Sequence, residues 1–142
     1  MSLRRARPAL DHLTFLDANM LFSAAWRADS GLRRLWALPA GIVRCTNSYA
    51  LVEAERNLLD TAMHERLHRL MTHVRMVPSI TRGELPPGVR LPAKDRPILL
   101  SALSAGCSHL LTGDRAHFGP CFGAIIGGVH VVRPGEYLAL VE

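Results

Sequence analysis

Short apolar runs alternate with amphipathic stretches along the chain, and this alternation predicts the main structural elements. The apolar runs predict β-strands over residues 13–17, 41–46, 74–77, 109–112 and 129–132. Apolar positions at helical spacing predict helices over residues 19–28, 49–60, 62–73 and 94–105, and shorter helices over 32–38 and 134–141. Strands that alternate with helices are typical of βαβ units, so we expect an α/β fold with a parallel sheet covered on both faces.

Turn and capping residues agree with these boundaries. Asn47 or Ser48 is suited to cap the helix that follows, and Gly106 is suited to close the helix before it. The segment 78–92 is rich in proline and glycine and predicts a loop. Gly113 is expected to permit the tight turn by which the chain leaves the fourth strand.

The composition fits one small domain. The chain has 142 residues, of which 49% are hydrophobic and 20% are charged, and this length can bury a core without disulfides. No apolar run reaches the roughly 18 to 20 residues that cross a bilayer, and the basic N-terminus lacks the features of a signal peptide. We expect one cytoplasmic domain over residues 1–142, with no membrane contact and a basic, flexible segment at 1–11. Its three cysteines are expected to be reduced: Cys45, Cys107 and Cys121.

The charge balance favours a polyanionic partner. The formal net charge is +5, and Lys94 is the only lysine among 17 basic residues. Basic side chains neutralise phosphates and release counterions, which favours binding to nucleic acid. Only 12 residues are acidic, so the purpose of each carboxylate can be considered individually.

Several acids occupy positions where chemistry is expected in a parallel sheet. Asp17 and Asp114 end two of the predicted strands, and Asp95 begins a predicted helix. Glu53 and Glu55 lie within one predicted helix and are alternative candidates for the site. They point about 200° apart around the helix axis, so only one of them can readily face the other acids. The competing interpretations are structural: helix capping for each aspartate and a solvated helix face for each glutamate.

The four acids Asp17, Glu53, Asp95 and Asp114 could converge on one edge of the sheet. Ligands of open parallel sheets bind outside the carboxyl ends of the strands, where the strand order reverses. Carboxylates at close range repel one another, so such a cluster needs a cation. Oxygen ligands suit one or two Mg²⁺ or Mn²⁺ ions, and the corresponding reaction class is metal-assisted hydrolysis of phosphodiester bonds.

The order of four segments resembles the successive motifs of PIN-domain proteins. These segments are FLDANMLFSA, SYALVEAERNL, KDRPILLSALSAGCSHLLTGD and RAHFG, and the resemblance extends over residues 13–141. It implies a three-layer α/β/α sandwich around a mainly parallel sheet of four to five strands. It also implies a Mg²⁺- or Mn²⁺-dependent ribonuclease for single-stranded RNA, of the kind found as toxins in bacterial toxin–antitoxin pairs. An antitoxin protein as partner and a homodimeric state follow from the same resemblance.

The resemblance also implies roles for individual residues. It makes four acids catalytic and metal-binding: Asp17, Glu53, Asp95 and Asp114. Glu53 is preferred over Glu55 because EAERNL matches the family's placement of an acid before a small residue. Asn19 and Thr112 would orient the metal ligands.

Substrate contacts are expected from the cations beside the acids. Lys94 and Arg96 flank Asp95, and Arg115 follows Asp114, so these three are candidates for RNA binding, although local ion pairing explains each equally well. His117 stands near the position where many family members carry a further acid. It is a candidate for contact with substrate phosphate or for proton transfer, and a structural histidine near a turn is the competing interpretation.

The aromatic residues predict no base-stacking surface. They are dispersed along the sequence and are expected in the core or at an interface: Trp26, Trp36, Tyr49 and Phe118.

Two other functions remain compatible with the sequence. One is a PIN-like module that binds RNA or protein without cleavage, although such a module has no need for four mutually repelling acids. The other is an aspartate-dependent phosphatase or phospho-acceptor domain on a doubly wound sheet. The phosphatase pattern places DxD after the first strand, whereas this chain has Asp17-Ala18-Asn19.

Overall fold

The computed structural model describes residues 12–142, so the expected flexible segment at 1–11 lies outside the described residues. The strands are β1 (His12–Leu16), β2 (Ile42–Thr46), β3 (Arg75–Met76), β4 (His109–Leu111), β5 (Ile125–Ile126) and β6 (Val129–Val132). The α-helices are α1 (Ala18–Trp26), α2 (Ser48–Asn57), α3 (Thr61–Met71), α4 (Arg96–Ser104), α5 (Arg115–Phe118) and α6 (Pro134–Val141). Short 3₁₀ helices cover Gly31–Ala37, Ala93–Asp95 and Gly119–Cys121.

The strands form one mainly parallel sheet in the order β3-β2-β1-β4-β6-β5. All neighbouring pairs are parallel except β5 and β6, which form an antiparallel hairpin. The α/β class and the mainly parallel sheet are therefore confirmed, and the sheet has six strands where four to five were expected. The additional strand is β5, whose two residues are too few to show a hydrophobic pattern.

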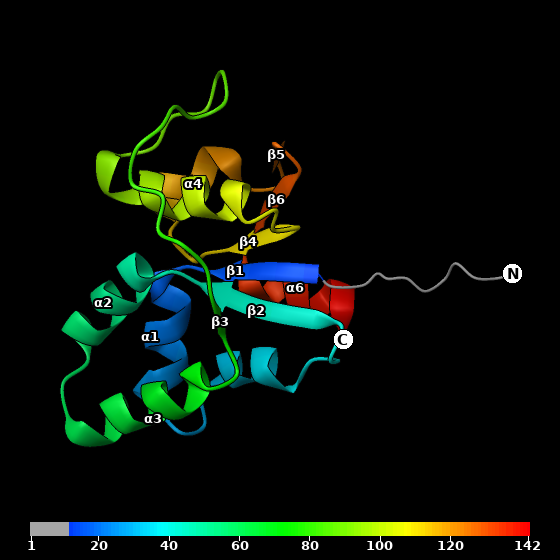
Figure 1. Cartoon of the computed structure of the whole chain (residues 1–142). Helices are drawn as coiled ribbons and strands as arrows, with labels where there is room; N and C mark the ends of the chain where they lie inside the picture. The colour runs from blue at the N-terminus through cyan, green and yellow to red at the C-terminus, as the bar shows by residue number, and fades with distance from the viewer. Residues whose placement is uncertain (1–11) are drawn as a thin grey trace, which may run out of the picture.

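Helices cover the sheet on both sides. The helices α1, α2 and α3 gather on one side of β1 and β2, whereas α4 lies on the other side (Figure 1). The central strands β1 and β4 are the most deeply buried, with Phe15, Leu16, Leu110 and Leu111 completely inaccessible to solvent. Burial on both faces explains why these strands are continuous apolar runs in the sequence.

Most predicted helix ends are close to the observed ones. Asn47 caps α2, because its side-chain oxygen accepts a hydrogen bond from Ala50 N at 2.8 Å. Gly106 follows α4 with a φ of +71°, the left-handed conformation that glycine adopts without strain. The expectation for Gly113 was wrong, since this residue has no positive φ and the turn after β4 does not require glycine's conformational freedom.

The cysteines are free and buried, as the composition suggested. The Sγ atoms of Cys45 and Cys107 lie 3.4 Å apart between β2 and the start of β4, at the distance of a weak thiol hydrogen bond. Among the described residues, no helix combines the length and the apolar character needed to span a membrane.

The strand order reverses between β1 and β4. The chain proceeds from β1 outward through β2 and β3, and then crosses back to add β4 on the opposite side of β1. Leu16 and Leu111, the last residues of these two strands, are partners in the parallel register. The residues that follow each strand therefore emerge side by side at the edge where parallel sheets bind their ligands.

Candidate active site

Asp17 leaves the sheet at the end of β1 and begins α1. Its Oδ1 accepts a hydrogen bond from Ala18 N at 2.7 Å, so Asp17 does act as a helix cap. Its Oδ2 accepts hydrogen bonds from the Thr112 hydroxyl at 2.8 Å and from Asn19 Nδ2 at 3.3 Å. The residue is only 5% exposed. Capping therefore accounts for one carboxylate oxygen, while the other belongs to a buried polar network.

Thr112 connects the ends of β1 and β4. Besides donating to Asp17, its Oγ1 accepts hydrogen bonds from Asn19 Nδ2 at 3.2 Å and from Asp114 N at 3.1 Å. Asn19 Oδ1 in turn accepts a hydrogen bond from Gly113 N at 2.9 Å. Asn19 and Thr112 thus fix the position of Asp17 relative to the turn that carries Asp114.

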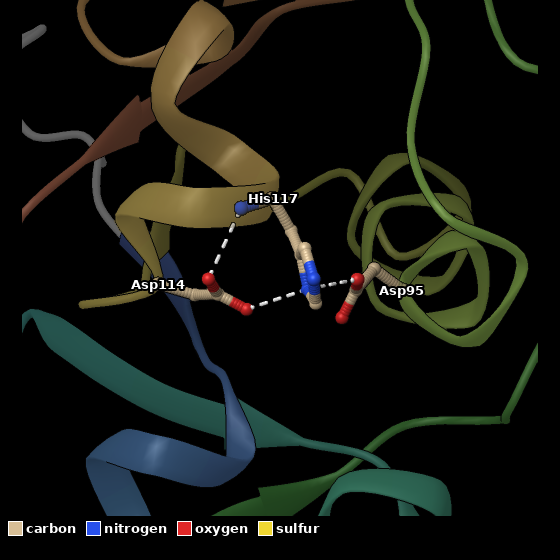
Figure 2. Close-up of side chains that lie close together, drawn as sticks. All are labelled: Asp95, Asp114 and His117. Atoms are coloured by element: carbon tan, nitrogen blue, oxygen red, sulfur yellow. Dashed lines mark hydrogen bonds and ion pairs between the residues drawn. The ribbon is translucent and has the colours of Figure 1, made fainter.

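Asp114, Asp95 and His117 form a second group at the same edge (Figure 2). Asp114 caps the short helix α5, because its Oδ1 accepts a hydrogen bond from His117 N at 3.1 Å. Asp95 precedes α4 but makes no capping hydrogen bond with its side chain. The His117 imidazole lies between the two acids, with Nδ1 2.8 Å from Asp95 Oδ2 and 2.9 Å from Asp114 Oδ2.

Burial dominates the electrostatics of Asp17. Loss of hydration raises the pKa of this carboxyl to about 6, and the negative charges of Asp95 and Glu53 contribute in the same direction. The hydrogen bonds from Thr112 and Ala18 oppose this shift but do not cancel it. Asp17 is therefore a carboxylate whose ionised form is poorly stabilised by its own surroundings.

Asp95 has a related environment. Burial raises its pKa, and the nearby charge of His117 counteracts that shift. The carboxylates of Asp114 and Glu53 raise the same pKa further, while Lys94 lowers it. Asp95 thus experiences two other acids of the predicted set, which links the Asp17 and Asp114 ends of the site.

Glu53, rather than Glu55, faces the other acids. Glu53 and Asp114 line one hollow of about 400 Å³, whose other residues are Asn19, Met20, Ser23 and Gly113. Glu55 instead lies 3.8 Å from His68 Nε2 on α3. The structure therefore brings together the four acids expected at the sheet edge and leaves Glu55 outside the cluster.

The three expected cations have different surroundings. Lys94 is exposed, and its positive charge lies close enough to Asp95 to lower the pKa of that carboxyl. Arg115 is exposed at the start of α5. Arg96 donates a hydrogen bond to Gly83 O at 2.7 Å, so its guanidinium supports the 78–92 loop. Lys94 and Arg115 are therefore better placed than Arg96 to contact a ligand.

An aromatic pair beside the acids was not anticipated from the sequence. Phe22 and Trp26 lie on α1 with ring centroids 5.1 Å apart. They line a hollow of about 330 Å³ that also contains Asn19, Glu53, Ala54 and Asn57. Asn19 and Glu53 also line the hollow that contains Asp114, here called the acidic hollow, so the aromatic and acidic hollows are adjacent. Phe22 and Trp26 are four residues apart in a predicted helix, and this spacing in the sequence already indicates that both rings lie on one helix face.

The residues present fit a divalent cation. Buried carboxylates that repel one another are stabilised by a cation, and carboxylate oxygens are ligands that Mg²⁺ and Mn²⁺ accept. Asp95 Oδ2 is buried and makes no hydrogen bond within residues 12–142, so it retains a lone pair for a ligand. Asp95, Asp114 and His117 have donor atoms within 4.8 Å of one another. Asp17 and Glu53 lie nearby, since the charges of Asp95 and Glu53 both raise the pKa of Asp17.

Comparison with known proteins gives similarity at the level of the fold. No protein-family model matches the chain, and no curated protein matches it at a significant level. Among solved structures, it is similar to a chain in the crystal structure of VapBC2 from Rickettsia felis bound to a DNA fragment from their promoter. The TM-score is 0.63 at 15% identity, and the match covers 85% of this chain and 98% of that chain. This similarity shows a shared α/β/α fold.

Proposed function

We propose that the protein is a metal-dependent ribonuclease that hydrolyses phosphodiester bonds in single-stranded RNA. The observation that carries the proposal is the convergence of Asp17, Glu53, Asp95 and Asp114 at the point where the strand order reverses. A cluster with these raised carboxyl pKa values is costly in the metal-free protein and becomes favourable when a divalent cation binds.

The residues divide the work in a simple way. Asp17, Asp95 and Asp114 would hold one or two Mg²⁺ or Mn²⁺ ions, and Glu53 closes the hollow from α2. When bound, such ions supply a hydroxide nucleophile and neutralise charge on the phosphoryl oxygens. Thr112 and Asn19 keep the Asp17 oxygen oriented through their hydrogen bonds.

The surroundings of the acids support a single-stranded substrate. An unpaired base can stack on Phe22 or Trp26 while its phosphate lies in the neighbouring acidic hollow. Lys94 and Arg115 are the exposed cations suited to the phosphate backbone. RNA as substrate agrees with the basic character of the whole chain.

We further propose that the ribonuclease is the toxin of a toxin–antitoxin pair. The similarity to a chain of VapBC2 supports a protein partner of the antitoxin kind, and the resemblance of the sequence motifs to PIN-domain toxins supports the same role. Co-expression with the neighbouring reading frame should yield a stable complex in which RNA cleavage is suppressed. A homodimeric state remains an expectation from the family resemblance.

Metal-dependent cleavage is the primary test. Purified protein with Mn²⁺ or Mg²⁺ should cleave single-stranded RNA, EDTA should stop the reaction, and an excess of metal should restore it. The substrates are total cellular RNA and unstructured oligonucleotides, and products are separated on denaturing gels. Cleavage that persists unchanged in EDTA, or intact RNA with both metals, would contradict the proposal.

The aromatic pair gives a prediction for RNA affinity. Because stacking contributes about 1–3 kcal/mol per base, Trp26→Ala should weaken RNA binding by roughly 5- to 150-fold. Affinity is measured by fluorescence anisotropy of a labelled oligonucleotide, in the Asp17→Asn background to prevent cleavage. Trp26→Phe is the matched control because it keeps an aromatic face. Equal affinities of the alanine variant and its parent would exclude stacking at this position.

A further inference from the structure

We propose that His117 is a metal ligand through its Nδ1 atom and makes this centre selective for Mn²⁺ over Mg²⁺. The inference rests on the proposed metal dependence and adds the identity of the ion. It departs from the all-carboxylate site expected from the sequence, in which His117 was a substrate contact or a structural residue.

The spacing of the donor atoms carries the first step. His117 Nδ1 is 2.8 Å from Asp95 Oδ2 and 2.9 Å from Asp114 Oδ2, and all three atoms lie within 4.8 Å of one another. Neighbouring ligands around an octahedral ion with bonds of roughly 2.1 Å are separated by roughly 3 Å. The two distances from Nδ1 are therefore those of neighbouring ligands of a shared ion.

The second step rests on two buried atoms that lack an aligned hydrogen bond. His117 Nδ1 is buried and makes no hydrogen bond within residues 12–142, and the same is true of Asp95 Oδ2. The close approaches of Nδ1 to the two acids are therefore ion-pair distances without hydrogen-bond alignment. The two buried atoms thus face each other at 2.8 Å without an aligned hydrogen bond, and a shared cation would bind both.

The local backbone holds the imidazole in this position. Asp114 caps α5, and its Oδ1 accepts a hydrogen bond from His117 N at 3.1 Å. This hydrogen bond fixes the two residues relative to each other. Both side chains project from one short turn toward Asp95 on the neighbouring helix (Figure 2). The group of three donors thus joins α5 to the residue that directly precedes α4.

Ligand chemistry then decides which ion is preferred. Mg²⁺ binds oxygen ligands, keeps several waters and loses its hydration reluctantly. First-row transition metal ions accept nitrogen donors more readily than Mg²⁺ does, and Mn²⁺ is the weakest binder of that series. Mn²⁺ also shares the carboxylate preference of Mg²⁺. A site of several acids and one imidazole therefore favours Mn²⁺, whereas the acids alone would accept either ion.

The test exchanges the donor atom at one position. An aspartate Oδ and a histidine Nδ1 both lie two bonds beyond Cβ, so His117→Asp replaces nitrogen by oxygen in nearly the same place. His117→Asn is a second variant that also removes the imidazole but adds no charge. His73→Gln is the matched control, because His73 is exposed and lies outside the cluster.

Two measurements without catalytic turnover report on the ligand. Pulsed electron paramagnetic resonance of bound Mn²⁺ detects magnetic coupling to an imidazole nitrogen. Titration of Mn²⁺ in competition with Mg²⁺ gives the ratio of the two dissociation constants. Wild type and His73→Gln should show the nitrogen coupling, and both His117 variants should lose it. The preference for Mn²⁺ over Mg²⁺ should be lost in His117→Asp.

The possible failures are distinguishable. Mn²⁺ that binds to wild type without nitrogen coupling would overturn the inference and leave the proposed function intact. Coupling and selectivity that survive in both His117 variants would overturn it in the same way. If wild type binds neither ion, the proposed metal-dependent function fails together with this inference.

Discussion

Replacing Asp17 or Asp114 by asparagine is expected to lower metal-dependent RNA cleavage by roughly a thousandfold or more. Each change removes one negative charge from the proposed metal site. A bound metal contributes several kcal/mol to transition-state stabilisation, and about 4 kcal/mol corresponds to a thousandfold change in rate. Cleavage rates with saturating Mn²⁺, measured on a defined oligonucleotide, provide the comparison.

The two substitutions are chosen because asparagine preserves the local backbone. Asp17 Oδ1 caps α1 through Ala18 N, and Asp114 Oδ1 caps α5 through His117 N. An asparagine side-chain oxygen can accept the same hydrogen bonds, since both residue types are good helix caps. Loss of activity in a variant with an unchanged circular dichroism spectrum would therefore reflect the missing charge.

Matched controls use acids that lie outside the cluster. Asp29→Asn removes an exposed carboxylate that pairs with Arg27, and Glu55→Gln changes the helix α2 two residues from Glu53. Both should retain cleavage, whereas Glu53→Gln should reduce it. Cleavage equal to wild type in Asp17→Asn and Asp114→Asn would identify a contaminating nuclease as the source of activity.

Stability of the metal-free protein should fall as the pH rises from about 4 to 6. Asp17 has a pKa of about 6 in the folded protein, against 3.8 as its ordinary value. The folded state therefore holds this proton more tightly than the unfolded state, and the advantage is lost as the carboxyl ionises. At 1.36 kcal/mol per pH unit of difference, the contribution is about 3 kcal/mol.

Comparison with Asp17→Asn isolates this contribution from other titrating groups. The variant should be about as stable as wild type near pH 4 and more stable by about 3 kcal/mol above pH 7, when both are kept in EDTA. For a domain of this size, that difference corresponds to an increase in Tm of roughly 6–12 °C. Thermal melts in EDTA across this pH range measure the effect.

Addition of Mn²⁺ should reverse the order at neutral pH. The metal binds the folded wild-type protein and stabilises it by mass action, whereas Asp17→Asn binds the metal weakly. A wild-type stability that is independent of pH between 4 and 7 in EDTA would contradict the buried, costly carboxylate on which the proposed function depends.

The sequence was informative wherever local pattern and physical position coincide. The central strands are buried on both faces, so Phe15, Leu16, Leu110 and Leu111 appear as continuous apolar runs, and the parallel α/β fold was predicted from them. The strand-end position of Asp17 and Asp114 followed from the same runs. Their catalytic roles remain predictions, although their positions at the sheet edge agree with the expected geometry.

Other features depend on contacts between distant segments. His117 was not recognised as the residue between Asp95 and Asp114, because α5 has only four residues and its orientation toward α4 has no periodic signature. The choice between Glu53 and Glu55 rested on family resemblance, since a solvated face is compatible with either residue. The hollow beside Phe22 and Trp26 forms only when α1 and α2 pack together.

The hydrogen bonds of the Thr112 hydroxyl determine when the site can assemble during synthesis of the chain. It joins Asp17 to the turn carrying Asp114, although Thr112 and Asp17 are 95 residues apart in the chain. A growing polypeptide presents Asp17 early, but β4 cannot pair with β1 until most of the chain has left the ribosome. A fragment that ends before Thr112 would lack both this link and Asp114, so the acidic cluster cannot assemble until the chain has been synthesised past residue 114.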